Sequence, residues 1–214
     1  MNFELFKPEA QANILPYAGV VEDFGLILTT EQSTRYLDYF LKHLAWQQDE
    51  VFLFGQHYQT ARQVAWYGDE HYQYHYSGTL KQAHPWQSGL WRLKQHIESL
   101  VGCHFNSCLA NLYENGTQAV GWHSDDEAAL VSKTGQETII ASLSLGATRK
   151  FSFKHKQTAK KVDVLLQSGQ LIVMRGDTQQ YWKHALMKST RIVEPRINLT
   201  FRHFFYIIFN NERC

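Results

Sequence analysis

The stretch that most constrains the fold of this chain is Arg196-Ile-Asn-Leu-Thr-Phe-Arg202, in which polar and apolar residues alternate strictly. Side chains of a β-strand point to opposite faces with a period of two, so one face belongs to a core and the other carries both arginines. Taken alone, the segment favours an amphipathic strand with a solvated basic face. The alternative is an anion site. The planar guanidinium group of arginine matches carboxylates in shape and hydrogen bonding. Along an extended strand Arg196 and Arg202 start roughly 20 Å apart, so two side chains that lean toward each other can hold a small dianion at both ends.

Composition narrows the class of protein. The chain has 214 residues, of which 44% are hydrophobic and 14% aromatic, and these fractions indicate a folded globular protein. The formal net charge is +1, so any nucleic-acid site must be a local patch. Three cysteines without CxxC spacing fit a reducing interior, and neither a signal peptide nor a bilayer-spanning apolar run is present. We therefore expect an intracellular monomer without a membrane partner, cytoplasmic if bacterial and nuclear if eukaryotic.

The order of the expected elements indicates the fold class. Residues 1–29 look irregular, Thr30 caps a helix that runs to about Trp46, and Ser88 caps a second helix. Almost everything else reads as short strands, with a hairpin tip at Phe54-Gly55. Two helices followed by about eight strands predict a mainly β fold with flanking helices (α+β), a β-barrel or a jelly roll with helices on one outer face.

A candidate metal site lies upstream of the arginine strand. His123-Ser-Asp125 places an imidazole and a carboxylate on the same face of an extended segment, and His184 is a third candidate ligand. Two histidines and one carboxylate on one octahedral face are typical of non-haem Fe(II) centres with three open positions. Because the chain has 11 histidines, the alternative is a hydrogen-bonded histidine beside a surface aspartate. Zinc is less favoured, because no cysteine lies at a ligand spacing.

Asn111-Leu-Tyr113 again puts two polar groups on one face of a strand, which alone is an ordinary strand with a polar tip. Along the chain it precedes the metal candidates and then the arginine strand. Fe(II) with three open positions needs a co-substrate that chelates two of them and leaves one for O₂. A 2-oxo-dicarboxylate meets this need, and its two carboxylates require two anion sites.

Together these motifs resemble those of the AlkB family of Fe(II)/2-oxoglutarate dioxygenases, over roughly residues 50–203. The resemblance implies a double-stranded β-helix, or jelly-roll, core. It also implies one compact domain, with an N-terminal extension and supporting helix (1–50), a nucleotide-recognition lid (51–104) and a catalytic core (105–214). In that family the matching positions assign Fe(II) to His123, Asp125 and His184, and 2-oxoglutarate to Asn111, Tyr113, Arg196, Asn198 and Arg202.

The resemblance further implies an oxidative demethylase that repairs N1-methyladenine and N3-methylcytosine in DNA. It consumes Fe(II)-activated O₂ and 2-oxoglutarate and releases formaldehyde, succinate and CO₂. Phe54 followed by Tyr74-His-Tyr76 is similar to the duplex-DNA-preferring branch, which carries an aromatic finger at the first position. A base must flip out of the duplex to react, and an apolar wedge commonly fills the gap. Tyr74 and Tyr76 would stack on the base, and Asp126 and Glu127 would face its positive charge.

Phosphate contacts require lysine and arginine, and the basic run beginning at Arg149-Lys150 supplies the candidates. Solvated charge on an ordinary surface is the alternative for this run. Two other functions remain open: the same chemistry on RNA, tRNA or protein, and a non-catalytic nucleic-acid-binding module on the same fold. The expected phosphate-binding residues are Lys154, Lys160, Lys161, Lys188 and Arg191.

Overall fold

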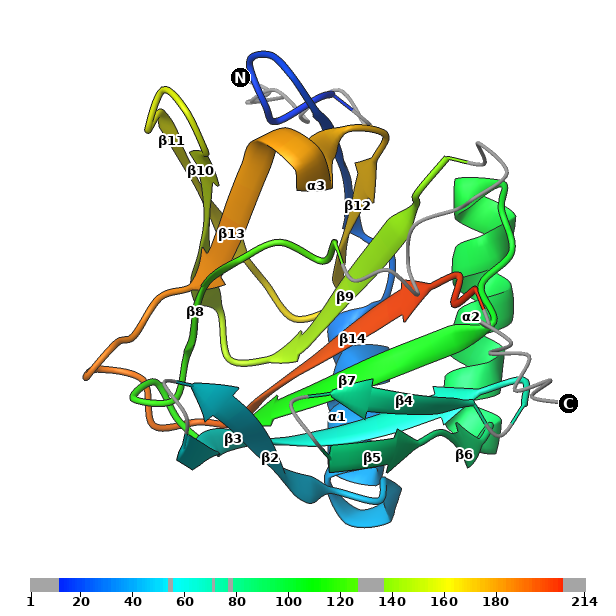
Figure 1. Ribbon diagram of the computed structural model, residues 1–214. Helices are drawn as coiled ribbons and strands as arrows, with labels where there is room; N and C mark the ends of the chain where they lie inside the picture. Colours follow the sequence, from blue (N-terminus) through cyan, green and yellow to red (C-terminus); the bar gives the residue numbers. More distant parts are fainter. Residues whose placement is uncertain (1–11, 54–55, 71, 77–78, 127–136, 206–214) are drawn as a thin grey trace, which may run out of the picture.

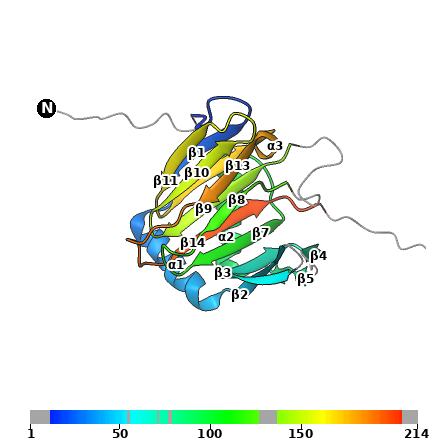
Figure 2. The same cartoon turned by 60° about the vertical axis from the view of Figure 1, so that its left-hand side comes forward.

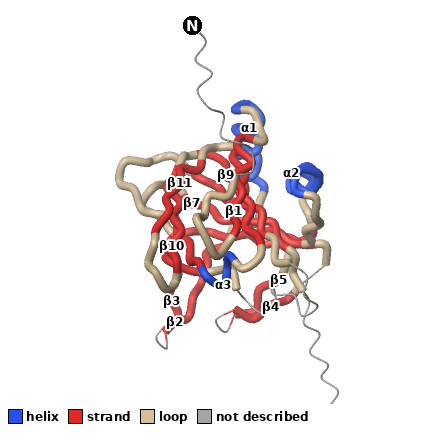
Figure 3. The backbone as a smooth tube through the Cα atoms, turned by 90° about the horizontal axis from the view of Figure 1, so that it is seen from above, coloured by secondary structure: helices blue, strands red, loops and turns tan. Residues whose placement is uncertain are grey.

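The computed structural model describes residues 12–53, 56–70, 72–76, 79–126 and 137–205. Its centre is a pair of β-sheets that face each other, and two long helices pack behind the larger sheet (Figures 1 and 3). This arrangement confirms the predicted jelly-roll core with flanking helices. None of the described helices combines the length and the apolar character that crossing a lipid bilayer requires.

The larger sheet places the arginine strand β14 at its centre. β14 pairs along its whole length with β7 on one side and with β9 on the other. A short parallel pair joins β6 (His84–Pro85) to β3. In spatial order the strands are β1 (Val20–Leu26), β12 (Gln170–Arg175), β9 (Ile140–Gly146), β14 (Arg196–Arg202), β7 (Ser107–Tyr113), β3 (Gln56–Gly68) and β2 (Gln47–Leu53).

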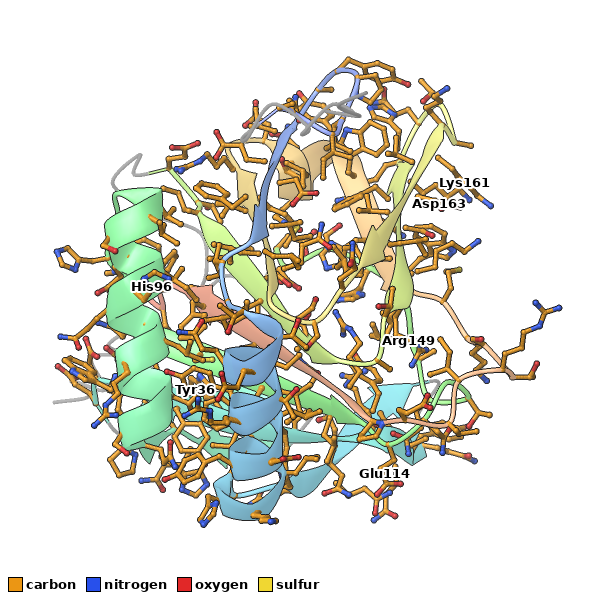
Figure 4. All side chains as sticks on the ribbon, turned by 180° about the vertical axis from the view of Figure 1, so that it is seen from behind. Tyr36, His96, Glu114, Arg149, Lys161 and Asp163 are labelled. Carbon is orange, nitrogen blue, oxygen red and sulfur yellow. The ribbon has the colours of Figure 1, made fainter. Side chains whose placement is uncertain are left out.

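All seven residues of β14 are buried, so of the two alternatives for this segment the solvated basic face is excluded. The apolar face of β14 packs in the same core as residues of the long helices, which lie in front of the sheet when the molecule is seen from behind (Figure 4). Its polar face looks into the space between the two sheets. A buried polar face needs hydrogen-bond partners or a ligand, because unsatisfied polar groups destabilise a core.

The smaller sheet closes over this polar face. All neighbouring strands of the smaller sheet are antiparallel. The β4–β5 hairpin forms a separate two-stranded sheet beside the β2–β3 end of the larger sheet (Figures 1 and 2). The strands are β11 (Lys161–Leu166), β10 (Arg149–His155), β13 (Trp182–Leu186) and β8 (Val120–His123), and the hairpin consists of β4 (Gln73–Tyr76) and β5 (Thr79–Gln82).

The helices begin close to the expected positions. α1 (Thr30–His43) is capped by Thr29 rather than Thr30, because a capping box with Gln32 satisfies the first free main-chain N–H groups. α2 (Ser88–Val101) has Gln87 rather than Ser88 as its N-cap. The short α3 (Thr178–Tyr181) leads into β13.

One further difference concerns the first half of the chain. The region expected to be irregular contains β1, which pairs with β12 about 150 residues away and has a bulge between Asp23 and Gly25. The expected hairpin is present as β2 and β3, but its tip, Phe54-Gly55, lies outside the described residues. The division of the chain at residues 50 and 104 stays a prediction.

Candidate metal centre and anion-binding face

The metal triad, His123, Asp125 and His184, comes together at the end of the smaller sheet. His123 on β8 lies directly opposite His184 on β13. Their Nε2 atoms lie 3.6 and 3.7 Å from Oδ1 of Asp125, and the three ligand atoms lie within 4.8 Å of one another. The predicted grouping of these three residues is therefore present in the fold.

His123 has the protonation that metal binding requires. Nδ1 of His123 lies 2.8 Å from the main-chain carbonyl of Gly121, so this nitrogen donates and Nε2 keeps its lone pair for a metal. Burial lowers the pKa of His123, and the neighbouring His184 lowers it further. His123 is thus neutral near pH 7, as a metal ligand must be.

Asp125 is held as a buried carboxylate. Burial alone would raise its pKa, but Arg202 and the two histidines outweigh that effect and hold the pKa well below its usual range. Its main-chain N–H donates to Oε1 of Gln179 at 2.9 Å, which fixes the loop after β8. One carboxylate oxygen and two imidazole nitrogens form a donor set that fits Fe(II).

The anion face consists of Asn111, Tyr113, Arg196, Asn198 and Arg202, which share the inner face of β7 and β14. Arg196 is 1% exposed and donates to Oγ of Ser144 at 2.9 Å and to Oδ1 of Asn198 at 3.0 Å. Oγ of Ser142 donates to the same Asn198 oxygen at 3.0 Å. These neutral contacts hold the Arg196 guanidinium in place, although its Nε has no hydrogen-bond partner among the described residues.

Tyr113 and Asn111 lie opposite the arginine strand in register. Tyr113 pairs with Arg196, and Asn111 pairs with Asn198. Burial raises the pKa of Tyr113, so its hydroxyl stays protonated and keeps a hydrogen to donate. The guanidinium carbon of Arg196 lies 5.8 Å from the centre of the Tyr113 ring, within cation–π range.

Arg202 connects the anion face with the metal triad. Its Nη2 lies 3.4 Å from Oδ2 of Asp125, and both side chains are buried. Arg196 stands at the other end of the same strand, six residues away. The structure therefore places one arginine beside the candidate metal ligands and one at a distance, as a two-ended anion site requires.

The expected substrate contacts are only partly described. Asp126 is exposed, and Nζ of Lys156 lies 3.5 Å from its carboxylate. Of the expected phosphate contacts, Lys160, Lys161, Lys188 and Arg191 are exposed and Lys154 is half-buried. The side chains of Tyr74 and Tyr76, and all of Phe54 and Glu127, lie outside the described residues.

Sequence reasoning assigned Arg149 to a basic surface run, but its side chain is 1% exposed and, within the part of the chain that the structure describes, donates to main-chain carbonyls alone. It missed Gln179, for which the local sequence carries no signal. It also missed Ser142 and Ser144, although their alternation with Leu143 and Leu145 was readable. Arg62 was missed as well. It forms an ion pair with Asp49 at 2.7 Å, and besides the larger effect of burial its positive charge acts to lower the pKa of both His123 and Tyr113.

A family model described as the 2OG-Fe(II) oxygenase superfamily matches residues 24–202. Human alpha-ketoglutarate-dependent dioxygenase alkB homolog 3 is 36% identical over 206 residues, covering 92% of this chain and 68% of the relative. Human DNA oxidative demethylase ALKBH2 is 35% identical over 174 residues, covering 78% and 64%. The bovine alkB homolog 3 is 43% identical over 155 residues, and the match spans only 52% of its length.

A solved structure, that of OsALKBH1, has a TM-score of 0.55 and covers 88% of this chain and 99% of its own. Its sequence identity is 15%, so this likeness concerns the fold alone. It agrees with the two facing sheets described above.

Proposed function

Because this chain belongs to the AlkB family of 2-oxoglutarate- and Fe(II)-dependent oxygenases, we propose that it removes alkyl groups from damaged nucleobases by oxidation. The observation that carries the proposal is the direct contact between the metal triad and the anion face. Arg202 touches Asp125, and Arg196 lies at the far end of the same buried strand. A metal alone would need no second arginine, whereas a chelating dicarboxylate uses both.

Different residues of the site hold the metal and the two ends of 2-oxoglutarate. The metal triad would hold Fe(II), which together with 2-oxoglutarate and O₂ supplies the oxidation of the alkyl C–H bond. Arg202 and Asn111 orient the end of 2-oxoglutarate nearer the metal. Arg196, Asn198 and the protonated Tyr113 hold the distal carboxylate. The products are succinate, CO₂, formaldehyde and the repaired base.

The proposed substrates are N1-methyladenine and N3-methylcytosine in DNA, with the duplex preferred. These bases are cationic, and the exposed carboxylate of Asp126 stands next to the metal ligand Asp125. The curated name of one relative, DNA oxidative demethylase, supports DNA as the substrate class. Stacking by Tyr74 and Tyr76, a contact by Glu127 and a wedge at Phe54 are parts of the same proposal.

The test measures formaldehyde release from oligonucleotides that carry each methylated base, as single- and double-stranded DNA and as RNA. Turnover should require added Fe(II) and 2-oxoglutarate, be highest on duplex DNA, and disappear in His184→Ala. His96→Ala is the matched control, because His96 is exposed on α2 behind the larger sheet (Figure 4). Absence of release from every nucleic acid refutes the proposal. Release only from RNA transfers the chemistry to that substrate.

A further inference from the structure

The β4–β5 hairpin is held in place by the residues at its base. Within the part of the chain that the structure describes, β4 and β5 pair only with each other. A two-stranded hairpin is marginally stable by itself in water, so packing elsewhere must fix its position. Tyr72, just before β4, and Ala83, just after β5, are 5% and 1% exposed, and the N–H of Ala83 donates to the carbonyl of Tyr72 at 2.9 Å. The base of the hairpin is therefore the part that is anchored in the protein.

Tyr72 packs against two aromatic rings. Its ring centre lies 5.1 Å from that of Phe204, which follows β14, and 6.4 Å from that of Trp66 on β3. The ring centres of Phe204 and Trp66 are themselves 5.2 Å apart. At Gly68 a Cβ would lie 2.7 Å from the Tyr72 ring, so this close approach requires glycine. Tyr72, Ala83, Phe204 and Trp66 form a small core of their own, which we call the hairpin anchor.

Asn106 joins the hairpin anchor to the end of β14 through its side-chain amide. Its Nδ2 donates to the carbonyl of Phe204 at 2.9 Å, and its Oδ1 accepts from the N–H of Phe204 at 2.6 Å. The same side chain forms a hydrogen bond with Tyr72. In the main chain, its N–H donates to the carbonyl of Arg202 at 3.3 Å and its carbonyl accepts from the N–H of Asp69 at 2.9 Å. Asn106 therefore contacts both the end of β14 and the segment between β3 and β4.

The hairpin anchor lies next to the proposed 2-oxoglutarate and metal contacts. Arg202, which lies 3.4 Å from Asp125, pairs in register with Ser107. Oγ of Ser107 accepts from Nε1 of Trp66 at 2.8 Å. Figure 1 shows the end of β14 and the starts of β7 and β4 on the same side of the molecule. A shift of the hairpin anchor would therefore move the hairpin relative to the candidate metal centre.

We propose that Asn106 is a positioning residue for the reaction: with Tyr72 and Phe204 it sets where the β4–β5 hairpin holds the alkylated base beside the metal triad. The inference rests on the proposed function, in which Tyr74 and Tyr76 of β4 stack on that base. Apolar packing is non-directional, whereas hydrogen bonds fix both distance and direction. A misplacement of about 1 Å can lower the rate of a reaction about 100-fold, so Asn106 need not touch the base to affect turnover.

The experiment compares the full chain with two variants. Asn106→Ala removes the side-chain hydrogen bonds and keeps those of the main chain, whereas Tyr72→Phe removes one hydroxyl and keeps the ring. Formaldehyde release from a methylated oligonucleotide gives kcat/KM, and titrations give the affinities for Mn(II) and 2-oxoglutarate. Hydrogen exchange with mass spectrometry reports on the amides of β4 and β5. The controls are Gln95→Ala and Tyr39→Phe, at exposed positions of α2 and α1 behind the larger sheet.

In Asn106→Ala we expect kcat/KM for the oligonucleotide to fall about 10- to 100-fold. The amides of β4 and β5 should exchange about 10-fold faster. Both affinities should stay the same, because the main-chain bond to Arg202 survives. Tyr72→Phe should show a smaller change of the same kind, and it remains decisive even if Asn106→Ala fails to fold. Neither control should change any of the four measurements.

If the wild type is active, an unchanged kcat/KM in both variants overturns the proposal. So does a loss of affinity for Mn(II) and 2-oxoglutarate in step with the loss of kcat/KM, because Asn106 would then be a structural residue of the whole site. The exchange measurement needs no turnover. A wild type that releases no formaldehyde refutes the proposed function, and faster exchange confined to β4 and β5 in the variants still shows that Asn106 places the hairpin.

Discussion

Arg149 connects the two chain segments that carry the histidines proposed to bind the metal. Its guanidinium donates to the carbonyls of Asn115, Gly116 and Gln118, which lie between β7 and β8, and to that of Met187, which follows β13. The four distances run from 2.7 to 3.2 Å. We therefore expect Arg149→Met to loosen both β8, which ends at the first histidine, and the end of β13.

The size of the effect follows from these contacts. Hydrogen bonds that involve a charged donor contribute about 1.5–3 kcal/mol each. Water that enters the loops restores some of the carbonyl contacts, and removal of the buried charge returns its desolvation penalty. A net loss of about 3–5 kcal/mol in the free energy of unfolding remains. Arg149→Lys keeps the charge and three donors but not the planar fork, so it should lose about half as much.

The assay is urea unfolding followed by circular dichroism, with metal affinity measured by titration with Mn(II). At a slope of about 2 kcal/mol/M, Arg149→Met should lower the urea midpoint by about 2 M. Loosened ligands should weaken Mn(II) binding about 10-fold or more, as the loss of outer contacts does at other metal sites. The control is Lys150→Gln, since Lys150 is an exposed neighbour with a surface ion pair. Arg149→Met within 1 kcal/mol of the wild type, with unchanged Mn(II) affinity, would refute this reasoning.

Three further outcomes test separate parts of the structure. Gln179→Ala removes the acceptor for the Asp125 N–H, so Mn(II) affinity should fall about 10-fold; an unchanged titration contradicts this. In Gly116→Ala the new Cβ would lie 2.2 Å from the carbonyl oxygen of Ser189, so the free energy of unfolding should fall by about 1–3 kcal/mol; an unchanged urea midpoint contradicts it. Burial raises the pKa of Cys103 to about 11, so at pH 8 only about one thiol in a thousand is ionised. Iodoacetamide should modify Cys103 far more slowly than an exposed thiol. Mass spectrometry locates the modified cysteine and measures its rate of modification, and a rate comparable to that of an exposed thiol would contradict the prediction.

The sequence predicted the site better than its surroundings, for a physical reason. Alternation along β14 and the His-x-Asp spacing are local, so they fix which side chains share a face wherever the strands lie. Burial is not local. The polar face of β14 is buried because β7 and β9 flank it and the smaller sheet covers it, and no pattern within residues 196–202 encodes those neighbours.

The same distinction accounts for what was missed. β1 forms because residues 20–26 find β12 about 150 positions later. The contact between Gln179 and Asp125 likewise joins residues 54 positions apart. Arg149 looked like a member of a basic run because charge is visible in a sequence, whereas the four carbonyls that surround it come from two distant loops. Long-range contacts of this kind are invisible to single-sequence periodicity.

Burial of the Arg196 cation lowers the free energy of unfolding of the ligand-free protein but prepares the site to bind an anion. Its hydrogen bonds go to neutral Ser144 and Asn198, no ion pair with a carboxylate is recorded for it among the described residues, and burial lowers its pKa to about 10. A buried cation without a counter-charge destabilises the fold. Arg196→Met should therefore raise the free energy of unfolding without ligand, by about 1–3 kcal/mol. The wild type in 2-oxoglutarate at 100 times its dissociation constant should gain about 2.7 kcal/mol, and the variant should gain almost nothing. The control, exposed Arg35→Met, should change neither value by more than about 0.5 kcal/mol. Urea unfolding in the presence of Mn(II), with and without 2-oxoglutarate, measures both. A variant that is destabilised alone and still stabilised by 2-oxoglutarate would show that Arg196 is a structural cation and not the distal carboxylate's partner.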